Sequence, residues 1–355
     1  MKAVYLISEQ GFSGLHTLSL GLGLRLQKDG FKVGFIKPLG NLYLKEGDAV
    51  TDADAFFLLE MLGLDETLKD ACPIVLTPQL VNNALVGQQQ DYLSIVKKAF
   101  KRISEDKDVV LIQSPMSARQ GAFLGLSSYE LAPQLDAQVL MVERFNDSLI
   151  ADNALHAKSI LGERMLGVIF NMISPGRQSF AQDMLAKYLE ETARIPVLGM
   201  IPEDRLLKSI SIRELATSLH GEVLSGEEAL DNLVEGVIVG AMGPEHAISF
   251  FRKRKGECVV TGGDRSDIQL AALEANLPCL ILSGHLYPSP IILGKADEMG
   301  VPVILVNDDT LTAAEKTDMV IKTARTRGPK KLDRLSELLD IYVDVDRFYR
   351  LIGLK

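Results

Sequence analysis

The chain has 355 residues, enough for two domains with sizeable cores. Its net charge of -9 argues against nucleic acid as the main partner. Although 47% of the residues are hydrophobic, no uninterrupted apolar stretch reaches the length of about 18 residues that a membrane span requires. Three cysteines show no close pair and no metal-ligand spacing, and no secretory signal follows Met1. We therefore expect a soluble, cytoplasmic protein with reduced thiols, no metal site, and no membrane or nucleic-acid partner.

Residues 2–40 predict the opening unit of a phosphate-binding α/β domain. A short apolar run (3–7) ends in a loop with Gly11 and Gly14, a long apolar segment reaches Gly30, and a second apolar run ends at Lys37-Pro38. This order indicates a strand, a glycine loop, a helix and a strand. Glycines let backbone N–H groups point at phosphate oxygens, and the helix N-terminus adds a favourable dipole.

The loop departs from the pattern G-x-x-x-x-G-K-[ST] at its functional positions. With Gly14 as the second glycine, Glu9 takes the place of the first glycine, Leu15 that of the lysine and His16 that of the hydroxyl residue; Thr17 is the nearest hydroxyl. Without the lysine, the charge that develops on a transferring phosphate is not stabilised. We expect the loop backbone to bind phosphate with little or no hydrolysis.

The segment after the loop has an ambiguous period. Leucines alternate with smaller or polar residues from Leu18 to Leu26, as in a strand. Because two parallel strands need a crossover between them, we predict a helix. Gly21 and Gly23 would then let this helix lie close to the sheet.

The following region predicts a doubly wound parallel sheet of the P-loop NTPase type, with helices on both faces. A polar segment with Asp48, Asp52 and Asp54 precedes a helix at 56–62, and the stretch 70–88, rich in Pro and Asn, predicts a long loop or lid. The remaining predicted strands are 108–113, 137–142, 166–171 and 196–201, and the predicted helices are 92–105, 147–161 and 178–193.

Ligands of such sheets bind at the carboxyl ends of the strands. Gly14, Lys37, Gln113 and Asn171 all lie at or just beyond such ends. Gln113 and Ser114 occupy the positions where an acidic residue orders Mg²⁺ in phosphate-binding domains, so we expect Mg²⁺ to be poorly coordinated.

Beyond Pro202 the pattern predicts a second, smaller α/β domain. Its expected strands are 233–239, 258–261, 280–283 and 303–306, and its expected helices are 212–219, 245–251, 267–275 and 291–299. We predict domains at 1–200 and 201–315 and a C-terminal helical segment at 316–355. Gly262 and Gly263 could form a second anion nest with Asp264 and Arg265; alternatively, Asp264 is a helix N-cap and Arg265 a surface ion pair.

Several stretches resemble a known arrangement. SGLHTLSLGLGLRL, KVGFIKPLG, LGVIFNMI and IPVLGMIPEDR are similar to the dethiobiotin-synthetase-like N-terminal region of long phosphotransacetylases, some of which also carry a leucine at the P-loop lysine position. From Pro202 to Val306 the chain resembles a DRTGG domain, supported by VEGVIVGAMGPEHA, TGGDRSDIQLAAL and LILSGHLYPSP. We interpret its eponymous residues as Asp204, Arg205, Thr261, Gly262 and Gly263.

The resemblance implies a regulatory module, because acetyl transfer in that family resides in a separate C-terminal domain that these 355 residues do not contain. We expect a stand-alone oligomer that binds ATP, ADP or another phosphate ligand and serves a phosphotransacetylase or related enzyme on another chain. The residues implied in ligand binding are Gly11, Ser13, Gly14, His16, Thr17, Lys37 and Asn171, with Lys37 on phosphate and Asn171 on adenine.

Plainer interpretations and rival functions stay open. Lys37 could be a solvent-exposed lysine at a strand end, Asn171 a turn residue, and His16 a polar replacement. One rival function is an ATP-dependent enzyme of the dethiobiotin-synthetase type, with Lys37 in place of the missing lysine. The other is a structural oligomerisation or partner-binding module with an empty loop.

Overall fold

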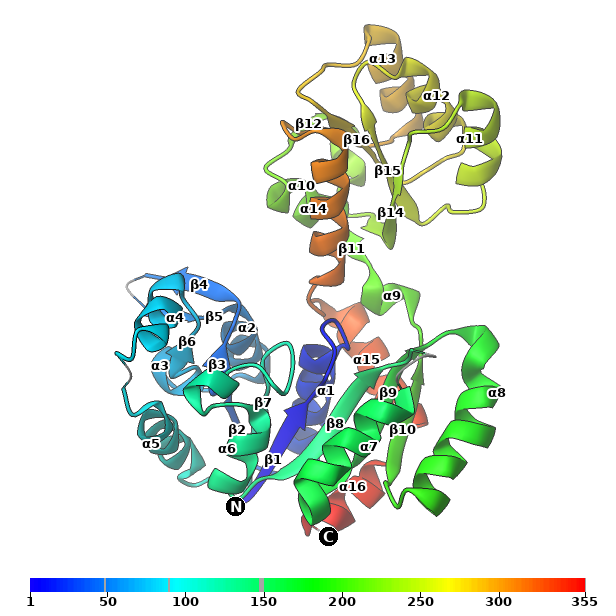
Figure 1. Ribbon diagram of the computed structural model, residues 1–355. Helices are drawn as coiled ribbons and strands as arrows, with labels where there is room; N and C mark the ends of the chain where they lie inside the picture. Colours follow the sequence, from blue (N-terminus) through cyan, green and yellow to red (C-terminus); the bar gives the residue numbers. More distant parts are fainter. Residues whose placement is uncertain (48, 89, 147–149, 355) are drawn as a thin grey trace. The chain divides into compact units, whose positions relative to one another are not determined.

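The computed structural model describes residues 1–47, 49–88, 90–146 and 150–354, which divide into two compact units (Figure 1). Unit 1 comprises Met1–Glu203 and Gly328–Lys355, and unit 2 comprises Asp204–Arg327. The segment 316–355, expected as a separate C-terminal part, is therefore divided between the two units. Asp48 and the first three residues of the helix predicted at 147–161 lie outside the described residues.

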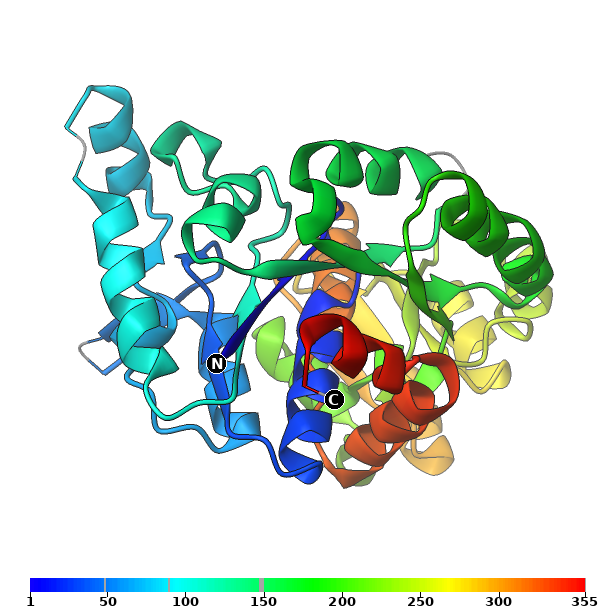
Figure 2. The ribbon, with the colours of Figure 1, turned by 90° about the horizontal axis from the view of Figure 1, so that it is seen from below.

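Unit 1 is built on a six-stranded parallel sheet with the order β10-β9-β8-β1-β7-β2. Figure 2 shows α7 on one face of this sheet and α1, α15 and α16 on the other, which confirms the doubly wound architecture. The strands are β1 (Lys2–Ile7), β2 (Val33–Ile36), β7 (Val109–Gln113), β8 (Gln138–Arg144), β9 (Met165–Ile173) and β10 (Val197–Pro202). The main helices are α1 (Leu15–Lys28), α2 (Ala53–Leu62), α5 (Tyr92–Ser104), α6 (Ser128–Gln134), α7 (Ile150–Leu161), α15 (Pro329–Tyr342) and α16 (Val345–Ile352).

The helix α1 confirms the prediction made against the alternating pattern of leucines. It is buried around most of its circumference, which is why apolar residues do not follow a single helical stripe. A Cβ on Gly21 would lie 2.5 Å from Leu339 Cδ1 of α15, and one on Gly23 would lie 2.8 Å from Leu62 Cδ2 of α2. We expected these glycines to let α1 lie close to the sheet, and this expectation is wrong. Gly21 and Gly23 chiefly make room for the neighbouring helices α15 and α2.

The prediction of a long loop or lid at 70–88 is wrong. This stretch holds the end of α3 (Leu68–Ala71), the short strand β6 (Ile74–Val75), which pairs with β3 (Leu39–Gly40), and the helix α4 (Pro78–Leu85). The Thr77 hydroxyl accepts a hydrogen bond from the Leu80 N–H, and Pro78 opens the helix. A Thr-Pro pair of this kind is a helix-start signal that outweighs the loop-like composition of the stretch.

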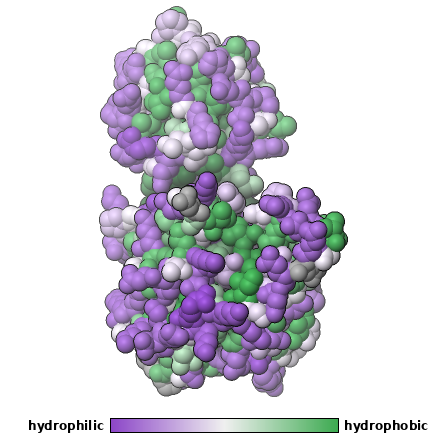
Figure 3. All heavy atoms as spheres, turned by 90° about the vertical axis from the view of Figure 1, so that its left-hand side faces the viewer, coloured by the Kyte–Doolittle hydropathy of each residue, from purple (hydrophilic) through white to green (hydrophobic). Residues whose placement is uncertain are grey.

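A β-hairpin that the sequence did not predict precedes α2. It consists of β4 (Tyr43–Glu46) and β5 (Ala49–Asp52), paired antiparallel. Figure 3 views the side of unit 1 that carries this hairpin and α4, and it shows apolar residues scattered among hydrophilic ones. The exposed apolar side chains of these elements are Tyr43, Val50 and Leu85, and Val86 directly after α4 is exposed as well.

The helix predicted at 178–193 is present in an unusual form. After α8 (Gln178–Phe180) the chain is π-helical in η4 (Ala181–Ala186) and η5 (Tyr188–Thr192). Unit 1 also contains the short 3₁₀ helices η1 (Ala122–Leu124), η2 (Gly162–Arg164) and η3 (Pro175–Arg177).

Unit 2 has a five-stranded sheet with the order β12-β17-β16-β15-β14. Alternate residues of its strands face two apolar clusters, so both faces of the sheet are covered. Four strands are parallel, β14 (Gly236–Val239), β15 (Glu257–Gly262), β16 (Leu280–Ser283) and β17 (Val303–Leu305), while β12 (Glu222–Ser225) is antiparallel to β17. The other elements are β11 (Ile210–Ser211), β13 (Leu233–Val234), α9 (Arg205–Lys208), α10 (Ile212–Ser218), η6 (Glu227–Ala229), α11 (Pro244–Phe251), α12 (Ser266–Glu274), α13 (Pro290–Met299) and α14 (Thr310–Lys322).

The smaller α/β domain is thereby confirmed, although several of its elements differ from the prediction. The strand expected at 233–239 is split into β13 and β14, and the antiparallel strand β12 was not predicted. Within the described part of the chain, no helix combines the length and the apolar character needed to cross a membrane.

Candidate functional site

The loop between β1 and α1 contains two left-handed residues and leads directly into a helix N-terminus. Phe12 and Gly14 are left-handed, with φ of 59° and 80°, and Gly14 is the N-cap of α1 without a side-chain cap. A Cβ on Gly14 would collide with the Asn171 amide of β9, so only glycine fits there. The N-terminus of α1 is thus held at the carboxyl edge of the sheet, where such sheets bind ligands.

The first turn of α1 supplies no ammonium group. Leu15 stands at the lysine position and is only 8% exposed, so its side chain packs into the protein. The His16 Nε2 and Thr17 Oγ1 atoms lie 3.2 Å apart, and both residues are half-buried. What this turn offers to a ligand is its backbone and two neighbouring polar side chains.

Lys37 directly follows β2 and is buried, which contradicts the interpretation of an exposed lysine. Its Nζ lies 2.8 Å from Asp52 Oδ1 and 3.0 Å from Asp54 Oδ2. Burial lowers the pKa of Lys37, but the charges of Asp54 and Asp52 outweigh it and the pKa is raised. The lysine is therefore charged, and two carboxylates more than neutralise it.

Asp52 is the centre of this cluster. Its Oδ2 accepts hydrogen bonds from the backbone N–H groups of Asn41 and Leu42, and its Oδ1 accepts from those of Asp54 and Ala55. The sequence placed Asp52 and Asp54 in a polar segment but did not connect them to Lys37. A lysine at a strand end followed by two aspartates before a helix was the signal available.

In phosphate-binding domains an acidic residue at the end of the strand that corresponds to β7 orders Mg²⁺. In this chain Gln113 and Ser114 stand there, with an amide and a hydroxyl group. Gln113 is buried, and its Oε1 has no hydrogen-bond partner among the described residues. The Ser114 hydroxyl donates to the carbonyl of Pro115. These groups supply no negative charge for a divalent cation.

A buried carboxylate that sequence analysis missed lies beside the loop instead. Glu143, in β8, is 0% exposed. Its Oε1 accepts hydrogen bonds from the Glu9 N–H at 2.6 Å and the Ser8 hydroxyl at 3.2 Å, and its Oε2 accepts from Asn153 Nδ2 at 3.1 Å. Desolvation raises the pKa of Glu143 to about 6, although these hydrogen bonds act in the opposite direction.

The Glu9 side chain adds a second acid at the start of the loop. Its carboxylate receives a hydrogen bond from the Tyr129 hydroxyl and lies 2.9 Å from the Arg119 Nε atom. Arg119 is largely exposed, whereas the Glu9 side chain is buried. The loop therefore begins beside two buried acids, Glu143 and Glu9, of which Glu9 is paired with Arg119.

Asn171 and Met116 fix the loop from outside. The Asn171 Nδ2 donates to the Ser13 carbonyl at 2.9 Å, and its Oδ1 accepts from the Met172 N–H at 2.9 Å. A Cβ on Gly11 would lie 2.9 Å from Met116 Cγ. Asn171 thus holds the Ser13 carbonyl by a hydrogen bond and packs against Gly14. Its contact with an adenine base stays a prediction.

The residues assigned to the DRTGG signature are not brought together in unit 2. Arg205 lies 3.8 Å from Glu235, which directly precedes β14. The buried Thr261 instead donates its hydroxyl to the carbonyl of Gly240, directly after β14. The two parts of the proposed signature therefore lie at opposite ends of this strand.

The glycine pair of unit 2 is packed in a way that disfavours an anion nest. The Asp264 carboxylate lies against Gly262, and Gly263 packs against the backbone of Leu286. Arg265, not Asp264, is the N-cap of α12, and its guanidinium pairs with Asp267 at 2.9 Å. The alternative of a surface ion pair for Arg265 is confirmed, and that of an N-cap for Asp264 is wrong.

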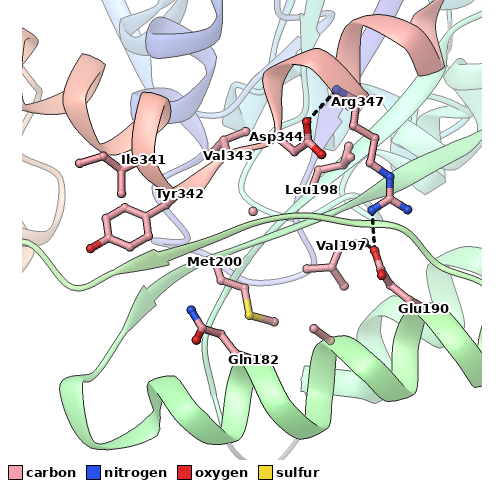
Figure 4. A pocket seen from close by; sticks show the side chains of 12 residues that line it. Gln182, Glu190, Val197, Leu198, Met200, Ile341, Tyr342, Val343, Asp344 and Arg347 are labelled. Carbon is pink, nitrogen blue, oxygen red and sulfur yellow. Dashed lines mark hydrogen bonds and ion pairs between the residues drawn. The ribbon is translucent and has the colours of Figure 1, made fainter.

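A concave region of unit 1, of about 500 Å³, runs along the edge strand β10, away from the residues that the sequence predicted to bind a ligand (Figure 4). Glu190 accepts hydrogen bonds there from the Val197 N–H at 3.1 Å and from Arg347 at 2.6 Å, and the Asp344 N–H donates to the Leu198 carbonyl. Because these polar groups bond one another, the region ties α16 to the sheet. The residues that line it are Gln182, Ala186, Glu190, Val197, Leu198, Gly199, Met200, Ile341, Tyr342, Val343, Asp344 and Arg347.

Two family models match the chain: an AAA domain (AAA_26) over residues 2–211 and a DRTGG domain over residues 214–320. The chain is 26% identical to the phosphate acetyltransferase of Pseudomonas aeruginosa over 367 residues, covering 96% of this chain and 51% of that protein. It is also 26% identical to the phosphate acetyltransferase of Synechocystis, covering 87% of this chain and 46% of that protein. The chain thus spans about half the length of the curated relatives it matches.

Among solved structures, chloroplast FtsY from Physcomitrella patens matches 57% of this chain and 59% of its own, with 16% identity and a TM-score of 0.37. The CBS and DRTGG domains of the regulatory region of Clostridium perfringens pyrophosphatase match 41% of this chain and 71% of theirs, with 20% identity and a TM-score of 0.29. The family models and the curated relatives confirm the resemblance expected from the sequence. Asp204 and Arg205 lie outside the matched DRTGG range, and Thr261, Gly262 and Gly263 lie inside it.

Proposed function

Since this chain belongs to the AAA domain family AAA_26, we propose that unit 1 binds a nucleotide or a related phosphate ligand with little or no hydrolysis, and that the protein is regulatory. Its partner would be a phosphotransacetylase or a related enzyme of acetyl-phosphate metabolism on another chain. This part of the proposal rests on the phosphate acetyltransferases of which the chain covers about half.

One observation carries the proposal: the loop places a left-handed glycine at a helix N-terminus but lacks a free lysine there. Gly14 is left-handed at the N-terminus of α1, whereas Leu15 occupies the lysine position and Lys37 is held by Asp52 and Asp54. Backbone N–H groups and the helix dipole suffice for binding an anion. Phosphoryl transfer additionally needs cations that stabilise the transition state.

The direct test is calorimetric titration of the purified chain with ATP, ADP, AMP and coenzyme A, with and without Mg²⁺. Gly14→Ala should weaken binding about tenfold, or about 1.4 kcal/mol, because it displaces Asn171 and distorts the loop. Gly30→Ala is the matched control, since Gly30 is also left-handed but its Cβ would meet open space. Lys37→Ala is less suitable because it would remove the cation that lies between two buried or half-buried carboxylates.

The rival enzymatic function makes a different prediction. If Lys37 replaced the missing lysine, Mg²⁺-dependent phosphate release would be measurable and would depend on Lys37. We expect none above background, because the Lys37 ammonium is engaged by two carboxylates. If no phosphate compound binds or shifts the thermal stability, the proposal is wrong and the structural module is favoured.

The regulatory part needs a second experiment. The oligomeric state would be measured by light scattering with and without each ligand. The activity of a phosphotransacetylase would then be followed with this protein added. A ligand-dependent change in that activity supports the proposal, and no change at saturating protein contradicts it.

A further inference from the structure

The first amide groups of the loop already have acceptors within the protein. In anion-binding loops, successive backbone N–H groups converge on the ligand. Here the Glu9 N–H donates to Glu143 Oε1 at 2.6 Å, and the Gln10 N–H donates to the Ser8 hydroxyl at 3.2 Å. The Ser8 hydroxyl itself lies 3.2 Å from the same carboxylate oxygen. Glu143 is therefore the acceptor for the first amide group of the loop.

Glu143 is placed there by the sheet and held from the opposite side. β8 pairs with β1 in the register Ile7 with Met141, which brings Glu143 beside the residues that follow β1. Asn153 of α7 donates to its second oxygen at 3.1 Å. No ion pair to Glu143 is present among the described residues, so its charge is balanced only by hydrogen bonds. An acid buried in this way costs free energy.

We infer that the Glu143 carboxylate is a built-in competitor for the phosphate loop, which disfavours strongly charged anions until its hydrogen bond to the Glu9 amide is given up. The inference rests on the proposed function and adds a specificity-determining residue to it. The ligand class it favours is a phosphate compound of low charge over a triphosphate, because every added negative charge near a fixed carboxylate is repelled.

The competition depends on the protonation of Glu143. A neutral carboxyl group attracts the Glu9 N–H less and no longer repels an anion. The other titratable groups packed nearby are Glu9 on the loop, Arg119 after β7, Tyr129 of α6 and His156 of α7, which contacts the Tyr129 ring. Burial raises the pKa of Glu143 to about 6, so the competitor is mainly charged at pH 7.5 and about half neutral at pH 6.

The test compares the full chain with Glu143→Gln and Glu163→Gln. Glutamine keeps the shape and can still accept from the Glu9 N–H, while Glu163 is fully exposed on η2 and serves as the control. Each protein is titrated with ADP, ATP and inorganic sulfate between pH 6.0 and 7.5; sulfate is included because its charge is constant over this range. A second variant, Glu143→Ala, covers the case in which the glutamine is poorly accommodated.

At pH 7.5, Glu143→Gln should bind about tenfold tighter than the unchanged protein, with the largest gain for ATP. This advantage should shrink toward pH 6, and Glu163→Gln should behave as the unchanged protein does. Anion binding of the same strength and pH dependence in Glu143→Gln and the unchanged protein would overturn the inference while leaving the proposed function intact.

A second readout needs no ligand. The backbone amide resonance of Glu9, followed by NMR in ¹⁵N-labelled protein, should titrate with Glu143 and stay constant in Glu143→Gln. If neither protein binds any of the anions, the proposed function and the competitor role both fail, even where the amide titrates. If anions bind but the Glu9 amide does not respond to pH, only the inference fails.

Discussion

The Nζ atom of Lys37 lies 2.8 Å from the Oδ1 atom of Asp52, and the two side chains are 1% and 0% exposed. The same carboxylate accepts hydrogen bonds from four backbone N–H groups. One buried acid thus joins the end of β2, the connection that follows it and the N-terminus of α2. Lys37 therefore has a role in the stability of the fold, and this role does not depend on a ligand.

Replacing this lysine should be strongly destabilising. We expect Lys37→Met to lower the free energy of unfolding by about 3–5 kcal/mol, because it leaves Asp52 buried without its cation. Urea denaturation measures the change. Lys45→Met, on the exposed hairpin strand β4, is the control and should change stability by less than about 0.5 kcal/mol. Equal stability of the two variants would show that the buried charge pair is unnecessary.

The loop glycine allows a test of geometry alone. Both Gly14 and Gly30 are left-handed, so alanine at either site costs about 1 kcal/mol in backbone strain. At Gly14 the new Cβ also meets the Asn171 amide, and we expect an additional loss of at least about 1 kcal/mol. Thermal unfolding would show the difference. Asn171→Ala in the Gly14→Ala background should recover part of it; no recovery would mean that Asn171 is not the obstacle.

The sequence predicts the alternation of strands and helices well, because α1 had to be a crossover and each buried strand was apolar. It also locates Lys37 and Gln113 at strand ends, whereas Asn171 lies within β9 and Gly14 lies at the N-terminus of α1. It could not predict that Glu9 and Glu143 meet, since this needs the knowledge that β8 lies beside β1 in the register Ile7 with Met141. Likewise, Asp52 lies next to Lys37 only through the hairpin β4–β5, which the sequence did not reveal.

Stability should depend on pH through Glu143. Its pKa is raised from 4.5 to about 6, so the folded protein holds this proton more tightly than the unfolded chain does. The free energy of unfolding therefore falls as the pH rises from about 4.5 to about 6, by about 2 kcal/mol in total, and is constant above. Urea denaturation across this range should show that Glu143→Gln lacks this loss. A parallel pH dependence in the variant and the unchanged protein would contradict the assignment to Glu143.

The C-terminal helix α16 should be an integral part of unit 1. Phe348 is buried against the unit, whereas Leu351 in the same helix is 37% exposed. We expect Phe348→Ala to cost about 3–5 kcal/mol and Leu351→Ala less than about 1 kcal/mol in urea denaturation. Similar small losses for both would mean that α16 is only loosely attached, and would favour the separate C-terminal segment expected from the sequence.

Two glycines of unit 2 should respond to alanine in opposite directions. A Cβ on Gly263 would overlap the Leu286 carbonyl, so Gly263→Ala must displace the loop after β16 and should destabilise unit 2 by about 2 kcal/mol or more. Gly294 lies exposed within α13 with open space around its Cβ position, and Gly294→Ala should stabilise by about 0.5–1 kcal/mol through helix propensity.

Hydrogen exchange of the β15 and β16 amides would report both changes on unit 2 itself. Because Gly262 pairs with Ser283 at the end of β15 and β16 next to Gly263, a loop shift at Gly263 should raise exchange first at Gly262 and Ser283. Unchanged exchange there in Gly263→Ala would show that the close approach of Leu286 is not needed to hold this end of the sheet.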